Sequence, residues 1–123
     1  VYGTATLDDY VAAVSQAAAV HGHTVQAFQT NHEGALVDAI HAARGVAQAI
    51  IINPGAFTHY AWSLHDALAA FDGPVVELHL SNPNAREPWR HHTTSTAEFG
   101  SFGYLFGTIR PCYLEPRFPR GTT

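Results

Sequence analysis

The chain has 123 residues and a formal net charge of −4, and charged side chains make up only 13% of it. This length fits one domain, and because no segment is strongly basic, nucleic acid is not an expected partner. The longest apolar runs are far shorter than the ~20 residues that a membrane span needs. The single cysteine, Cys112, excludes an intrachain disulfide. A cytoplasmic protein without a membrane partner is therefore expected, and its sparse charge favours an oligomer.

Helix and strand patterns alternate through the first 80 residues. Thr6 and Asp9 resemble a capping box with Asp in place of the usual Glu, and Gly22 is a natural helix stop. The isoleucine run near residue 50 is typical of a parallel strand buried on both faces. The predicted elements are a helix over about 6–21, a strand over 24–30, a helix over about 33–44, a strand over 49–53, a helix over 61–71 and a strand over 74–80.

This order implies βαβ units around a parallel sheet, and hence an α/β fold. In such sheets, ligands bind outside the carboxyl ends of the strands. The residues that follow the three predicted strands, 30–33, 53–55 and 79–82, are polar and rich in hydrogen-bond donors. A functional site is therefore expected where these segments meet.

The segment after Arg90 has a different composition, rich in Gly, Pro, Ser and Thr and without a clean period. Pro111, Pro116 and Pro119 would interrupt a helix at the end of the chain. No helix is predicted there.

Nine histidines raise the question of a metal site. Their spacing includes no HExxH motif and no pairing with the cysteine. His21 and His23 lie at the end of a predicted helix, where solvation is the simpler interpretation. We therefore predict that the chain holds no transition metal.

Four stretches together resemble one known family, the type II 3-dehydroquinate dehydratases. They are VYGTATLDD (1–9), TNHEGALVDAIHAAR (30–44), NPGAFTHYAWSLHDAL (53–68) and ELHLSNPNAREPWRHH (77–92). The resemblance implies a flavodoxin-like three-layer sandwich with a parallel sheet, and a dodecamer built as a tetramer of trimers. It also implies a lyase of the shikimate and quinate pathways. The expected reaction converts 3-dehydroquinate to 3-dehydroshikimate by anti elimination through an enolate, without any cofactor.

The same resemblance implies three catalytic residues. Tyr2 matches the tyrosine that removes the C2 proton, and His79 matches the general acid that protonates the departing hydroxyl. Glu77, two positions earlier on the same strand, points to the same side and matches the carboxylate that orients His79. Without the motif, Tyr2 reads as a terminal aromatic and His79 as a histidine satisfied at a strand end.

Further positions match residues that bind the substrate. Leu80 and Ser81 would hold its carboxylate through backbone N–H groups and the Ser81 hydroxyl, and Asp66 would reach the site of a neighbouring subunit. A solvated Asp66, or one paired with His65, is the alternative. Asn53, His59 and Arg90 match ligands of the substrate hydroxyls, although Asn53 also suits a Pro-Gly turn and Arg90 a surface position. Arg86 and Glu87 are expected to shape the loop.

The match departs from the family at both ends. The family's first strand and the arginine of its lid loop have no counterpart before Val1, so 1–90 is expected to be a flavodoxin-like catalytic domain without them. The stretch 91–123 is expected to be a divergent continuation of that domain. Two alternatives stay open: a non-catalytic relative that keeps the fold and binds a small polyol carboxylate, and an unrelated flavodoxin-like binding module.

Overall fold

The computed structural model of the chain describes residues 3–82, 85–92 and 104–106. It forms two compact units. Of the described residues, the sheet unit holds 27–82, 85–92 and 104–106, and the helix unit holds 3–26. Among the described residues, no helix has both the length and the apolar character needed to cross a bilayer.

The helix unit contains α1, Leu7–Val20, whose start is set by a complete capping box. The Thr6 Oγ1 accepts from the Asp9 N–H at 3.2 Å, and the Asp9 Oδ2 accepts from the Thr6 N–H at 2.7 Å. After the helix, Gly22 takes a φ of 77°, a left-handed conformation that favours glycine. The predicted helix over 6–21 and both of its end signals are confirmed.

The capping box gives a first prediction. Thr6→Ala should destabilise the start of α1 by about 1 kcal/mol, because the N–H of Asp9 loses its acceptor. We expect faster amide hydrogen exchange in the first turn, with Thr4→Ala as the control. Equal protection in the two variants would contradict the assignment.

The hydrogen bond from the Thr6 N–H to the Asp9 carboxylate makes the stability of this helix start depend on pH. The backbone N–H of Thr6, and then its side chain, hold the pKa of the Asp9 carboxyl below its ordinary value. The free energy by which Asp9 stabilises the folded chain is therefore fully present above the pH range where unfolded carboxyl groups titrate. It is lost as the pH falls through the lowered pKa.

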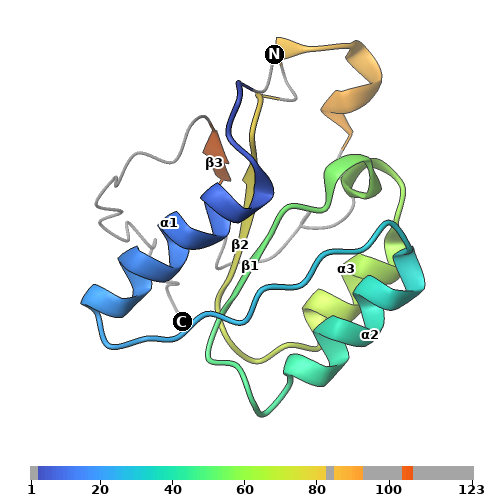
Figure 1. Ribbon diagram of the computed structural model, residues 1–123. Helices are drawn as coiled ribbons and strands as arrows, with labels where there is room; N and C mark the ends of the chain where they lie inside the picture. Colours follow the sequence, from blue (N-terminus) through green and yellow to red (C-terminus); the bar gives the residue numbers. More distant parts are fainter. Residues whose placement is uncertain (1–2, 83–84, 93–103, 107–123) are drawn as a thin grey trace, which may run out of the picture. The chain divides into compact units, whose positions relative to one another are not determined.

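In the described part of the sheet unit, three parallel strands pair in the order β1-β2-β3 (Figure 1). In register, Ile52 lies beside Glu77, and His79 lies beside Phe106. The strands are β1 Ile50–Ile52, β2 Val75–His79 and β3 Tyr104–Phe106, and the α-helices of this unit are α2 Glu33–Ala43 and α3 Trp62–Ala69. Four of the predicted elements are thereby confirmed: the helices over 33–44 and 61–71 and the strands over 49–53 and 74–80.

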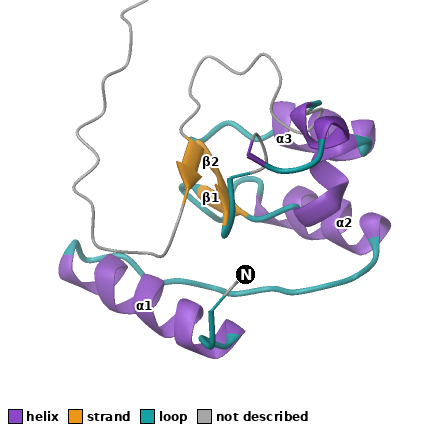
Figure 2. Cartoon of the chain, turned by 90° about the horizontal axis from the view of Figure 1, so that it is seen from above, coloured by secondary structure: helices purple, strands orange, loops and turns teal. Residues whose placement is uncertain are grey.

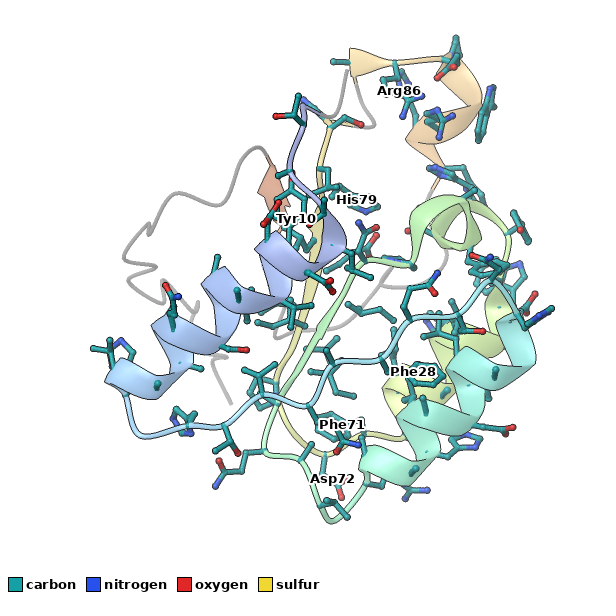
Figure 3. The ribbon with its side chains drawn as sticks, in the orientation of Figure 1. Tyr10, Phe28, Phe71, Asp72, His79 and Arg86 are labelled. Carbon is teal, nitrogen blue, oxygen red and sulfur yellow. The ribbon has the colours of Figure 1, made fainter. Side chains whose placement is uncertain are left out.

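Helices α2 and α3 lie side by side against one side of the sheet (Figure 2). Their apolar stripes meet the sheet in one core, in which Leu64 of α3 is completely buried. Phe71 closes this core at the end of β2 that lies away from His79 (Figure 3). The buried apolar residues are Ile40, Ile52, Ala61, Leu64, Ala67, Leu68, Phe71 and Val75.

The predicted strand over 24–30 is wrong. The structure describes these residues, and none of them is in a strand. A strand needs a hydrogen-bonded neighbour, and the ladders of the described residues join only β1 to β2 and β2 to β3. In flavodoxin-like sheets, the strand after the first helix pairs with the strand before it. The described residues before α1, 3–6, form no strand.

Two further strand features differ from expectation. Ile51 of β1 is 58% exposed, so this strand is not buried on both faces, because α2 and α3 cover only one side of the sheet. The short strand β3 lies in the stretch where no periodic element was predicted. Three residues are too few to show a period, and β3 is defined by its pairing with β2.

Candidate active site

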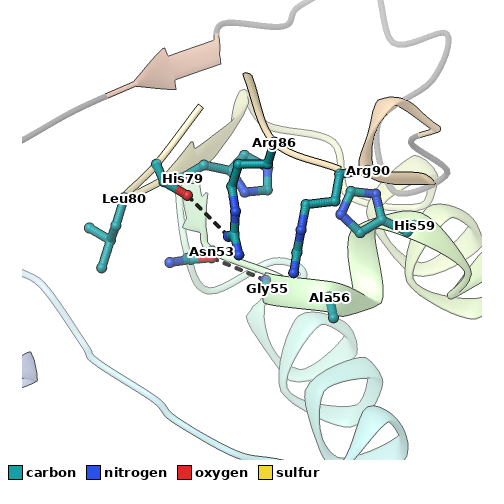
Figure 4. A pocket seen from close by; sticks show the side chains of 9 residues that line it. Asn53, Gly55, Ala56, His59, His79, Leu80, Arg86 and Arg90 are labelled. Atoms are coloured by element: carbon teal, nitrogen blue, oxygen red, sulfur yellow. Dashed lines mark hydrogen bonds between the residues drawn. The ribbon is translucent and has the colours of Figure 1, made fainter. Parts of the chain in front are cut away.

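A pocket of about 390 Å³ opens at the carboxyl ends of β1 and β2 (Figure 4). This is the location predicted from the polar junctions 53–55 and 79–82. The junction 30–33 does not line it: the Thr30 Oγ1 accepts from the His32 N–H, and Glu33 accepts a hydrogen bond from Ser63 of α3. The lining residues are Asn53, Gly55, Ala56, His59, His79, Leu80, Ser81, Arg86 and Arg90.

His79 pairs with the buried carboxylate of Glu77, which the buried Thr58 hydroxyl also contacts. Alternation along β2 buries both Glu77 and His79 on the same face. The Nε2 of His79 lies 2.5 Å from Glu77 Oε1, and the Thr58 hydroxyl donates to that same oxygen at 2.6 Å. The exposed fraction is 0% for Glu77, 1% for Thr58 and 8% for His79.

This arrangement determines the hydrogen-bonding roles of the His79 ring. A carboxylate can only accept, so Nε2 carries a hydrogen and Nδ1 is the ring nitrogen that Glu77 does not engage. Nδ1 is therefore the His79 atom through which a proton can pass to a ligand in the pocket.

Asn53 serves the turn that follows β1. Its Oδ1 accepts from the Gly55 N–H at 3.0 Å, and Gly55 has a φ of 57°. The turn leads into the 3₁₀ helix η1, Gly55–His59. The turn role of Asn53 is thus present in the structure, and the same side chain lines the pocket, so a ligand role would use its amide group.

His59 and Arg90 face the pocket from the two short helices η1 and η3, the latter being Pro88–His91. The His59 Nδ1 lies 2.6 Å from the His92 carbonyl oxygen and therefore donates to it. The ring of Trp89 lies edge-on to His59, with 5.2 Å between the ring centroids. The Arg90 guanidinium stacks on the Trp89 ring, 4.0 Å from its centroid. The side chains of His59 and Arg90 are thus oriented before any ligand arrives.

A carboxylate completes the orientation of Arg90. The Arg90 Nε donates to Glu87 Oε2 at 2.5 Å. The backbone N–H of Glu87, and then this bond from Arg90, hold the pKa of the Glu87 carboxyl below its usual value. Glu87 therefore keeps its charge at neutral pH, which supports the predicted role of this residue in shaping the loop.

Arg86 brings a second guanidinium to the pocket. Its Nη1 donates to the Ser81 Oγ at 3.3 Å, next to Leu80 (Figure 4). Arg86 was predicted only to shape the loop, but it lines the pocket as Arg90 does. Two arginines and the backbone at the end of β2 make this wall suited to a carboxylate.

Asp66, a predicted substrate-binding residue, does not line this pocket. The Asp66 side chain is 88% exposed on α3, and its Oδ1 lies 3.6 Å from the His65 Nδ1, so the solvated and locally paired interpretations both describe its place within one chain. Tyr2 lies outside the described residues. Within residues 3–82, 85–92 and 104–106, no group of three His, Cys, Asp or Glu side chains is arranged to hold a metal ion.

Sequence reasoning missed Thr58. A threonine beside the matched His59 has no chemical signature of its own, and its role comes from a contact with Glu77, which is 19 residues away. The one available signal was its place inside the NPGAFTH motif.

An α/β fold with a buried carboxylate–histidine pair and two arginines at the carboxyl ends of its strands defines an acid–base enzyme for a small anionic substrate. The family model for dehydroquinase class II matches residues 1–114. The chain therefore belongs to the class II (type II) dehydroquinase family.

Individual relatives agree with this assignment. The chain is 55% identical over 119 residues to a catabolic 3-dehydroquinase of Penicillium rubens, which covers 91% of this chain and 77% of the relative. It is 46% identical over 121 residues to a 3-dehydroquinate dehydratase of Cereibacter sphaeroides, covering 93% and 82%. The crystal structure of a type II dehydroquinase from Propionibacterium acnes matches with a TM-score of 0.77 at 33% identity, covering 89% and 73%.

Proposed function

We propose that this chain is a 3-dehydroquinate dehydratase, a hydro-lyase that converts 3-dehydroquinate to 3-dehydroshikimate. Its family and its relatives from a fungus and a bacterium support this activity. The observation that carries the proposal is the Glu77–His79 pair, which is buried behind a pocket that two arginines also line.

The pocket offers distinct groups for the two polar parts of the substrate. The backbone N–H groups of Leu80 and Ser81, with the Ser81 hydroxyl, bind the carboxylate, and Arg86 adds positive charge beside them. Asn53, His59 and Arg90 bind the ring hydroxyls. Holding both parts fixes the ring so that its leaving hydroxyl faces His79.

The reaction then needs one base and one acid. Tyr2, as a phenolate, removes a proton from C2, and the electrons are delocalised onto the neighbouring carbonyl oxygen as an enolate. When the enolate collapses, the C1–O bond breaks and the hydroxyl leaves as water with the proton of His79. Glu77 stabilises the imidazolium before this transfer.

Three further features belong to the same proposal. The sheet and its helices form part of a flavodoxin-like three-layer sandwich, which the match to the Propionibacterium acnes enzyme supports. The protein is a cytoplasmic dodecamer, a tetramer of trimers. The exposed Asp66 carboxylate reaches the site of a neighbouring subunit in that assembly, consistent with its 88% exposure in the single chain.

The product itself provides the test. 3-Dehydroshikimate is a conjugated enone, so its formation from 3-dehydroquinate is followed by ultraviolet absorbance. We expect turnover by the wild-type chain. Saturable binding of 3-dehydroquinate without any product would favour the alternative of a non-catalytic relative, and the absence of both would contradict the proposal.

A further inference from the structure

Of the buried polar residues that the structure describes, Thr58 is the one without a role in the proposed reaction. Its side chain is 1% exposed, and its hydroxyl donates to the Glu77 oxygen that also accepts from His79. A buried hydroxyl without a hydrogen-bond partner would destabilise the fold, because burial removes its hydrogen bonds to water. The Thr58 hydroxyl has the carboxylate of Glu77, the partner of His79, as a hydrogen-bond acceptor.

The fold gives Thr58 a fixed place for this contact. It lies in η1, which starts after the Asn53–Gly55 turn and ends at His59. Since a β-branched side chain has few χ1 choices, the hydroxyl is held in one direction. The short helix that presents His59 to the pocket therefore also fixes the carboxylate of Glu77.

The hydrogen bond from Thr58 to Glu77 stabilises the site to a different extent before and after His79 transfers its proton. While His79 is an imidazolium, the Glu77 anion is compensated by a full positive charge. Once His79 has given up its proton, the buried anion depends more strongly on its other donors, of which Thr58 is one. A donor that stabilises the Glu77 anion beside neutral His79 favours proton release from the His79 imidazolium.

Resting on the proposed function, we propose that Thr58 is a positioning residue that holds the Glu77 carboxylate and thereby tunes the proton-donating strength of His79. It does not touch the substrate. The titratable and charged groups that line the pocket with His79, or pair with it, are Glu77 on β2, His59 in η1, Arg86 in the loop after β2 and Arg90 in η3. All of them are unchanged in a Thr58 variant, so a shift in pH dependence reports on the hydroxyl.

The test compares Thr58→Val, which keeps the shape but removes the hydroxyl, with Thr58→Ser, which keeps the hydroxyl. For Thr58→Val we expect kcat to fall by about 10- to 100-fold, the range for a hydrogen bond to a charged group. KM should stay within about twofold, and the alkaline limb of the pH–rate profile should move to higher pH. Thr58→Ser should remain close to wild type in all three.

The outcomes separate this inference from the activity on which it rests. If wild type turns over 3-dehydroquinate while Thr58→Val has the same kcat and pH profile, the positioning role is wrong. If wild type itself is inactive, the proposed function fails instead. If Thr58→Val does not fold, Thr58→Ala takes its place, and equal kcat and pH profiles for Ala and Ser would overturn the inference.

Discussion

Replacement of His79 by alanine is expected to lower kcat by about 10²- to 10⁴-fold, the usual contribution of a positioned general acid. Of the described residues that line the pocket, His79 is the one backed by a buried carboxylate. Without it, the C1 hydroxyl must leave as hydroxide or take its proton from water. Substrate binding should change much less, because the arginines and the backbone at the end of β2 remain.

The measurement combines the absorbance assay with size-exclusion chromatography of wild type and variant. The matched control is His23→Ala, which removes an exposed histidine outside the pocket. Unchanged turnover in His79→Ala would contradict the assignment. Loss of turnover together with loss of the native assembly would make His79 a structural residue.

Glu77→Gln is expected to have the second large effect, a fall in kcat of about 10²- to 10⁴-fold, by analogy with loss of the carboxylate behind a catalytic histidine. Glutamine has nearly the same size, but it is neutral and has a single acceptor oxygen. Both Thr58 and His79 now donate to one carboxylate oxygen. The amide cannot stabilise the imidazolium as the carboxylate does.

The sign of the pH effect follows from the same charge. Glu77→Gln removes the negative charge beside His79 Nε2, so we expect the alkaline limb of the pH–rate profile to move to lower pH. This is opposite to the direction expected for Thr58→Val. Asp38→Asn, which neutralises an exposed carboxylate on α2, is the control. A pH profile identical to wild type in Glu77→Gln would show that the carboxylate does not act through His79.

Short-range patterns suffice to predict structure where the interacting residues lie close together in the sequence. The capping box of α1 involves only Thr6 and Asp9, three residues apart, and it is present as predicted. A pocket also lies at the predicted edge of the sheet, because parallel strands bring their carboxyl ends to one edge. In contrast, the alternation over 24–30 resembles a strand, but no described strand pairs with it.

By itself, the sequence determined the helices and two of the strands, the α/β class, the edge of the sheet that carries the pocket and, through its motifs, the family. Only the tertiary structure decided the rest: which strands find partners, that Arg86 faces the pocket, that Asp66 lies outside it within one chain, and that Thr58 stands behind Glu77. Caps and periodic stripes depend on residues a few positions apart. Strand pairing and the Thr58–Glu77–His79 contacts depend on segments that only folding brings together.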